Sequence, residues 1–241
     1  MRFERGPARR ARRMAMICTF VGLASMAIAP LASPAGPPPP PGGVFVYAPR
    51  GAAEGQRPVT VLLHGLCGHP ESACGPFVDV STERGWLVCP RGEDPCGGGS
   101  RWRLRADEDG RLVDDAVGEL ARDQGGRVDA SAARVLVGFS LGGIAAVRIA
   151  EAGGGRYVGL VVIASQVHPD AARLAKAGVS RVVLAAGDYD ITSAPLQDDA
   201  RALNRAGVAT RFVSLGKFGH GYPPDMAERM REPMEWVARG T

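Results

Sequence analysis

The sequence has almost no net charge once its first 35 residues are set aside. The whole chain has a formal net charge of +4. Residues 1–35 contain six arginines and one glutamate, so the rest of the chain keeps 23 basic and 24 acidic side chains, a net charge of −1. Nucleic-acid binding and adsorption to anionic membranes both depend on a basic surface. We therefore expect no nucleic-acid partner, and no membrane contact beyond the leader described next.

A full membrane-spanning run is also missing. The uncharged apolar run 14–29 is shorter than the about 20 residues that a spanning helix needs. It follows an arginine-rich start and precedes small residues, which is the order of an export signal peptide. We predict an export signal at 1–35, a Pro/Gly-rich spacer at 36–43, and a periplasmic or extracellular domain at 44–241. An uncleaved signal anchor is the alternative, because apolar residues continue past position 29.

The cysteine spacing of a structural zinc site is absent, since no two cysteines form a Cys-x-x-Cys pair. The predicted domain has an even number of cysteines, and an exported chain meets an oxidising compartment, so we predict disulfides and no metal or cofactor. The seven-residue spacings favour two local bridges, Cys67 to Cys74 and Cys89 to Cys96.

Short β-branched runs alternate with longer amphipathic runs through the domain. Several of the short runs are apolar throughout, as in parallel strands that are covered on both faces. The alternation predicts an α/β fold, with a mostly parallel central sheet covered by helices on both faces. The expected strands are Val44–Ala48, Val59–Leu63, Trp86–Cys89, Val135–Phe139, Val158–Ala164, Val179–Ala185 and Ala209–Ser214. The expected helices are Glu71–Arg84, Leu112–Asp123, Leu141–Ala152, Asp170–Ala177, Pro195–Ala206 and Asp225–Val237.

A Gly-x-Ser-x-Gly stretch places Ser140 between an expected strand and an expected helix. In a glycine-rich chain this short motif alone decides little, but its position at a strand-to-helix turn is typical of a catalytic nucleophile. Gly138 and Gly142 would relieve the crowding of such a turn. An ordinary helix N-cap serine is the alternative.

Histidines are scarce, and only four could act as a base for Ser140: His64, His69, His168 and His220. His220 follows the last expected strand in a glycine-lined loop. Two aspartates, Asp188 and Asp190, follow an earlier strand, and either could orient an imidazole.

These motifs together resemble the α/β-hydrolase family. The chain has His64-Gly65 after the family's third strand, Gly-x-Ser-x-Gly around Ser140 after the fifth, Gly-x-x-Asp ending at Asp190 after the seventh, and His220 after the eighth. The resemblance implies Ser140 as nucleophile, His220 as general base and acid, and Asp190 as the orienting acid, which fits the Gly-x-x-Asp spacing better than Asp188. It also implies an oxyanion hole made by the backbone N–H groups of Leu66 and Leu141.

The resemblance also bears on the cysteines and on access to the site. The family's third and fourth strands are neighbours, which gives an alternative pairing, Cys67–Cys89 with Cys74–Cys96. Only 165–178 separates the two strands between which lids usually enter, so no cap domain is expected. The long connection 91–110 is expected to be an irregular loop beside the cleft. Trp102 and Tyr222 are candidate substrate-binding residues.

The architecture is most similar to that of small lidless exported carboxylesterases and dienelactone-hydrolase-type enzymes. This similarity implies a monomeric serine hydrolase that cleaves small or polymer-linked carboxylic esters through an acyl-enzyme. An acyltransferase with the same triad is one alternative, and a non-catalytic binding domain that keeps the fold is another.

Overall fold

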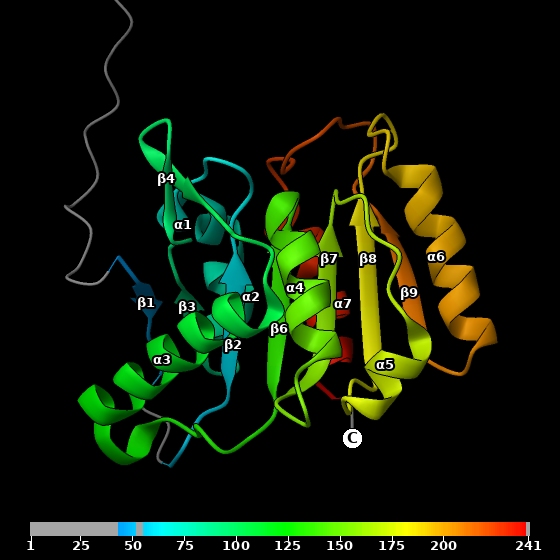
Figure 1. Cartoon of the computed structure of the whole chain (residues 1–241). Helices are drawn as coiled ribbons and strands as arrows, with labels where there is room; N and C mark the ends of the chain where they lie inside the picture. Colours follow the sequence, from blue (N-terminus) through cyan, green and yellow to red (C-terminus); the bar gives the residue numbers. More distant parts are fainter. Residues whose placement is uncertain (1–42, 52–54, 240–241) are drawn as a thin grey trace, which may run out of the picture. The chain divides into compact units, whose positions relative to one another are not determined.

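The computed structural model describes residues 43–51 and 55–239 (Figure 1). The predicted export signal lies outside the described residues, as does nearly all of the predicted spacer. None of the helices within 43–51 and 55–239 is both long enough and apolar enough to cross a membrane.

A seven-stranded sheet forms the centre of the fold, in the order β1-β3-β2-β6-β7-β8-β9. Only β1 runs antiparallel to its neighbour, and the other strands are parallel. The inner parallel strands are mostly apolar on both faces and almost wholly buried, as predicted, whereas the parallel edge strand over 209–214 is partly polar and more exposed. The strands are β1 (Phe45–Tyr47), β2 (Val59–Leu63), β3 (Trp86–Cys89), β6 (Arg134–Phe139), β7 (Tyr157–Ile163), β8 (Arg181–Ala186) and β9 (Ala209–Ser214).

Helices cover both faces of this sheet, and each face has its own hydrophobic core. One core contains side chains of α3 (Ala106–Gln124), α4 (Leu141–Glu151), α5 (Ala171–Lys176) and α6 (Ser193–Arg205). The opposite core contains side chains of α1 (Pro70–Cys74), α2 (Val78–Thr82) and α7 (Met226–Ala238). Figure 1 shows α3 and α4 in front of the sheet and α7 behind it. The predicted α/β architecture is confirmed.

The single helix predicted over 71–84 is wrong in detail. Two short helices, α1 and α2, are separated there by a 3-10 turn over Gly75–Phe77. Pro76 lies in this turn, and proline has no N–H to continue the helical hydrogen bonds. Phe77 and Val80 still reach the core, so the segment covers the sheet as expected.

The prediction of an irregular loop over 91–110 is also wrong. Its first half forms a hairpin of β4 (Asp94–Cys96) and β5 (Gly99–Arg101), and α3 already begins at Ala106. The tip residues Gly97 and Gly98 both have positive φ, as a tight turn requires. The helix begins early because the acidic residues 107–109 lie in its first turn, where negative charge is stabilised.

Both predicted disulfide pairings are wrong. The structure joins Cys67 to Cys96, and Cys74 to Cys89. The first bond links the loop after β2 to the β4–β5 hairpin, and the second links α1 to β3. Cys96 reaches Cys67 because the hairpin folds back over that loop, and spacing along the sequence carries no information about this contact.

No cap domain enters between β7 and β8 in the described chain, where 164–180 contains only α5. The carboxyl ends of the parallel strands therefore remain uncovered on that side. In sheets of this type, ligands bind at this edge.

Candidate active site

Ser140 lies in a sharp turn between the end of β6 and the start of α4. Its backbone has φ 52° and ψ −120°, a region that residues other than glycine rarely occupy. A side chain at Gly138 would collide with the carbonyl of Gly142, and one at Gly142 would collide with the carbonyl of Leu63. The glycines of the motif are thus needed for the close approach of strand, turn and helix.

Ser165 holds this turn from the neighbouring strand. Its hydroxyl, which is buried, donates to the Ser140 carbonyl at 2.6 Å, and the Ser140 N–H donates to the carbonyl of Ile163 at 2.9 Å. A side chain at Gly143 would occupy the place of the Ser165 hydroxyl. Sequence reasoning missed Ser165, because nothing in its local pattern marks it.

His220 lies beside Ser140. Its Nε2 is 3.0 Å from the Ser140 hydroxyl oxygen, and its Nδ1 is 2.8 Å from Oδ2 of Asp190. The His220 side chain is 52% exposed, whereas that of Asp190 is fully buried. The imidazole ring packs against Phe139, with ring centroids 5.2 Å apart. Ser140, His220 and Asp190 thus form one continuous line of contacts.

Asp190 is held by hydrogen bonds on both of its oxygens. The backbone N–H and the hydroxyl of Thr192 each donate to Oδ1 at 2.9 Å, while Oδ2 accepts from His220. Burial raises the pKa of Asp190, but the hydrogen bonds from Thr192 and His220 outweigh it and hold that pKa below its ordinary value. Asp190 is therefore a fixed anion that orients the imidazole. Thr192 was not identified from the sequence.

Asp188 points elsewhere. Its carboxylate accepts from the hydroxyl of Ser214 at 2.5 Å on the surface. Of the two aspartates that the sequence left open, the structure brings Asp190 to His220. The backbone N–H of Asp190 donates to the carbonyl of Gly187 at 3.0 Å, and Asp190 is buried in this turn.

The loop after β2 lies against the opposite side of Ser140. A Cβ built on Gly65 would be 3.4 Å from Cβ of Ser140 and 3.0 Å from the Phe139 ring, so only glycine fits without displacing them. Leu66 follows, with 60% of its surface exposed at the mouth of the site. Among the described residues, no backbone carbonyl accepts from the N–H of Leu66 or of Leu141. Both N–H groups have the freedom that an oxyanion hole requires.

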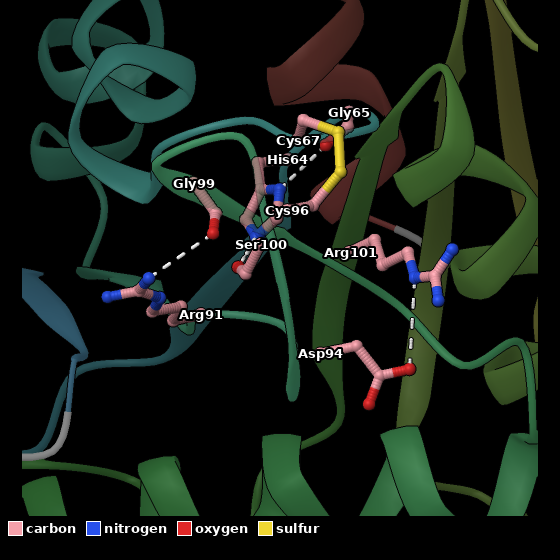
Figure 2. Close-up of a disulfide and its surroundings, with 9 residues drawn as sticks. All are labelled: His64, Gly65, Cys67, Arg91, Asp94, Cys96, Gly99, Ser100 and Arg101. Atoms are coloured by element: carbon pink, nitrogen blue, oxygen red, sulfur yellow. Dashed lines mark hydrogen bonds and ion pairs between the residues drawn. A yellow bond between two sulfur atoms is a disulfide. The ribbon is translucent and has the colours of Figure 1, made fainter.

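His64 anchors this loop from beneath and is fully buried (Figure 2). Its Nε2 accepts from the N–H of Gly92 at 3.1 Å and contacts the Ser100 hydroxyl at 3.0 Å. Its Nδ1 is 2.8 Å from the carbonyl oxygen of Gly65. Nε2 must accept and Nδ1 must donate, which fixes the neutral tautomer with the proton on Nδ1. Burial lowers the pKa of His64 and keeps it neutral.

The β4–β5 hairpin completes the support of the loop. Figure 2 shows the Cys67–Cys96 bond joining hairpin and loop directly above His64. The N–H of Ser100 donates to the carbonyl of Gly68 at 3.1 Å, and a side chain at Gly99 would collide with the Cys67 carbonyl. The loop is thus held by a covalent bond, a backbone bond and a buried imidazole.

A cavity of about 250 Å³ opens above Ser140. Its walls are mostly apolar, with His220 on one side and Leu66 on the other. Ile191, 80% exposed, lies at its rim. The arrangement presents an activated hydroxyl, a base and two free N–H groups to an apolar space, which suits attack on an uncharged carbonyl.

Neither of the two candidate substrate-binding aromatics, Trp102 and Tyr222, lines the cavity above Ser140. Trp102 is 2% exposed and its indole N–H donates to the His64 carbonyl at 2.8 Å, so most of the ring supports the loop. Tyr222 packs behind the site, with its ring 4.6 Å from that of Phe139 and 5.8 Å from that of Phe77. Burial raises its pKa. Direct contact of either aromatic with a substrate stays a prediction.

The two remaining histidines, His69 and His168, lie on the surface of the described part of the chain. His69 is exposed, and His168 is a surface residue 3.1 Å from Asp199. Within 43–51 and 55–239, no three His, Cys, Asp or Glu side chains are grouped so that they could hold a metal ion.

No protein-family model and no curated protein matches the sequence. Solved structures do match. The esterase PE8 is 18% identical over 80% of this chain and 99% of that protein, with a TM-score of 0.60. A carboxylesterase of Bacillus cereus is 20% identical over 82% of this chain and 94% of its own, with a TM-score of 0.59. An esterase of the fungus Rhizomucor miehei is 14% identical over 82% of this chain and 79% of its own, with a TM-score of 0.62.

At these identities the likeness establishes the fold. The chain has the α/β-hydrolase fold, as the sequence predicted, and residues 43–51 and 55–239 contain no cap domain.

Proposed function

We propose that this protein is an exported serine hydrolase that cleaves carboxylic esters. The observation that carries the proposal is the unbroken line of contacts from Asp190 through His220 to Ser140, at the edge of the sheet where ligands bind. The esterases of the same fold support it. The two disulfides support export, because such bonds persist in oxidising compartments.

In the proposed mechanism, each of these groups has its own role. The Ser140 oxygen attacks the carbonyl carbon of the ester as its proton passes to Nε2 of His220, and the oxyanion that forms accepts from the N–H groups of Leu66 and Leu141. His220 then returns that proton to the alkoxide leaving group, which departs as an alcohol. Water, deprotonated by the same Nε2, attacks the acyl-enzyme and releases the acid. Asp190 remains ionised throughout.

The uncapped cavity favours small ester substrates. A volume of about 250 Å³ lies below the range of roughly 300–1,000 Å³ in which drug-sized ligands bind. Acetyl and butyryl esters fill such a space, whereas the end of a long acyl chain would leave it.

The proposal is tested by covalent labelling and by turnover. A fluorophosphonate probe is expected to label the wild-type protein at Ser140, and the protein is expected to hydrolyse 4-nitrophenyl butyrate. Ser140→Ala should abolish labelling and lower kcat by several orders of magnitude, with an unchanged circular dichroism spectrum. The matched control is Ser180→Ala, which removes the hydroxyl of an exposed serine that does not line the cavity, so labelling should persist. Labelling at another residue, or none at all with folded protein, would overturn the assignment.

A further inference from the structure

A second cavity adjoins the one above Ser140. It has a volume of about 460 Å³, and its walls include Leu66 and Leu141, which also line the first cavity. These are the two residues to which the oxyanion hole is assigned. The two cavities therefore meet at the point where the carbonyl of a bound ester would lie.

Three arginines line the second cavity, at alternate positions of one short segment: Arg101, Arg103 and Arg105. Arg101 and Arg103 share a face because alternate side chains of an extended chain do so, whereas Arg105 follows a change of backbone direction at Leu104, where φ is 61°. Trp102, between the first two, is directed inward and donates to the His64 carbonyl. This bond fixes the segment so that its arginines face outward, into the cavity.

The carboxylates near this segment pair with all three guanidinium groups, but Arg101 has only a long ion pair. Arg103 bonds to Asp94 at 2.9 Å and also contacts Glu108, which bonds to Arg105 at 2.8 Å. The shared Asp94 is 3.8 Å from Nε of Arg101, too far for a hydrogen bond. Arg101 is therefore the least tightly paired of the three guanidinium groups.

The two terminal nitrogens of Arg101 are free to donate hydrogen bonds to a ligand. Figure 2 shows the contact of Arg101 with Asp94 through its Nε, and no dashed line joins its two terminal nitrogens to another residue drawn there. Within the described part of the chain, these two nitrogens donate to no acceptor. A guanidinium with two parallel free N–H groups matches the two oxygens of a carboxylate.

His220 decides which half of the ester would carry this carboxylate. The leaving oxygen takes its proton from Nε2 of His220, so the alcohol part of the ester must lie beside that residue. His220 lines the first cavity and not the second. The second cavity is therefore reached from the acyl side of the carbonyl.

We propose that the enzyme prefers esters whose acyl group ends in a carboxylate, that is, monoesters of dicarboxylic acids, and that Arg101 binds this carboxylate. The proposal rests on the ester hydrolase function proposed above and names the substrate class of that site. Arg101 is then a specificity residue: it contacts the far end of the substrate and takes no part in bond cleavage.

The test compares two substrates that differ only in the terminal charge. The 4-methylumbelliferyl monoester of adipic acid carries a free carboxylate, and its methyl-capped form does not. Wild-type kcat/KM should be about tenfold higher for the free acid, since only this ester accepts charge-assisted hydrogen bonds from the guanidinium at an exposed site. Arg101→Gln should remove the preference while kcat/KM for the capped ester and for the butyrate is unchanged. Arg101→Lys should restore part of it, and added salt should weaken it because the site is open to solvent.

Two controls separate this proposal from others. Arg201→Gln removes an exposed arginine on α6 that lines neither cavity, and it should keep the preference intact. An acetate ester whose phenol leaving group carries the carboxylate tests the other half of the substrate. If that ester showed the Arg101-dependent preference instead, the acyl-side assignment would be wrong.

Failure of this inference is distinguishable from failure of the proposed function. Equal rates on the charged and capped esters, with normal turnover of the butyrate, would overturn the carboxylate site alone. No turnover of any ester and no fluorophosphonate label at Ser140 would overturn both.

Discussion

The two sides of Ser140 are built in different ways. On one side, the loops after β8 and β9 bring Asp190 and His220 together without any covalent bond between them. On the other side, the loop after β2 is tied to the β4–β5 hairpin by the Cys67–Cys96 bond and by a buried histidine. We call these the acid–base side and the oxyanion side.

The difference matches the task of each side. In the proposed mechanism, His220 gains and loses a proton and contacts first a serine and then a leaving group, and its side chain is half exposed and held by a single carboxylate. An oxyanion hole has only to keep two N–H groups in place, and every loss of rigidity there costs transition-state stabilisation. Covalent support therefore belongs on the oxyanion side.

The largest expected effect tests the acid–base side. Asp190→Asn should lower kcat/KM for 4-nitrophenyl butyrate by roughly 10³–10⁴-fold, because an amide cannot hold the imidazole in the required tautomer and charge state. Asp188→Asn, two residues away, removes a carboxylate that bonds only to Ser214 and should change the rate by less than about threefold. A larger loss for the Asp188 variant would reverse the assignment of the acid.

The two disulfides give the next largest effect and separate activity from stability. Replacing both Cys67 and Cys96 by serine frees the oxyanion loop, and kcat should fall about tenfold, less than the loss of a whole oxyanion donor. KM should change little, because the apolar cavity is intact.

The matched control is replacement of both Cys74 and Cys89 by alanine. These buried cysteines join α1 to β3, and neither lines the cavity above Ser140, so kcat should be retained. The free energy of unfolding should fall by about 3 kcal/mol, as expected for a bond that closes a 15-residue loop. Urea unfolding and initial rates measure both quantities. Equal kcat for the two double variants would show that the Cys67–Cys96 bond does not organise the site.

The smallest expected effect concerns a carboxyl pair under the arginine segment. Asp109 is fully buried and accepts from the N–H groups of Arg103 and Arg105. Burial and the neighbouring Glu93 raise its pKa from 3.8 to about 6. A raised pKa means that the folded state holds the proton more tightly than the unfolded chain. The stability gained is therefore present at low pH and is lost as the pH rises from about 4 to about 6.

Glu93→Gln should reduce this pH dependence, because an amide removes the like charge and can donate to Asp109. At pH 7.5 the variant should be more stable than wild type by about 1–2 kcal/mol, and at pH 4 the difference should shrink. Thermal unfolding across this range measures it. The control is Glu119→Gln, which changes an exposed residue of α3, the helix that carries Asp109. This variant should show neither effect.

The elements that sequence reasoning located well are those with a local signature. The buried strands were found because their residues are mostly apolar, and β2 and β3 have the predicted bounds. The more exposed β9 also has the predicted bounds. Ser140 was found because its turn needs glycines at fixed positions. Chain order separated His220 from the other histidines, although it left Asp188 and Asp190 open.

What was missed depends on contacts between segments that are distant in the chain. Ser165 supports the turn of Ser140 from the next strand, 25 residues away, and Cys67 pairs with a cysteine 29 residues away. The hairpin over 94–101 was missed because its strands have three residues each, including a proline and glycines, and lack a hydrophobic alternation. Its stability comes from packing against Cys67 and Gly68, which no local pattern reports.

The unequal burial of the two disulfides has a consequence for how the protein is made. Cys74 and Cys89 lie in the core, so their bond has to form before the core closes and is afterwards out of reach of a soluble thiol. Cys67 and Cys96 are partly exposed, so their bond can open and close in the finished fold. Protein recovered from a reducing cytosol and then oxidised is expected to be a mixture of chains, and only those that acquired the inner bond early can be completed by later oxidation. The yield of active enzyme therefore depends on the compartment in which the chain first folds.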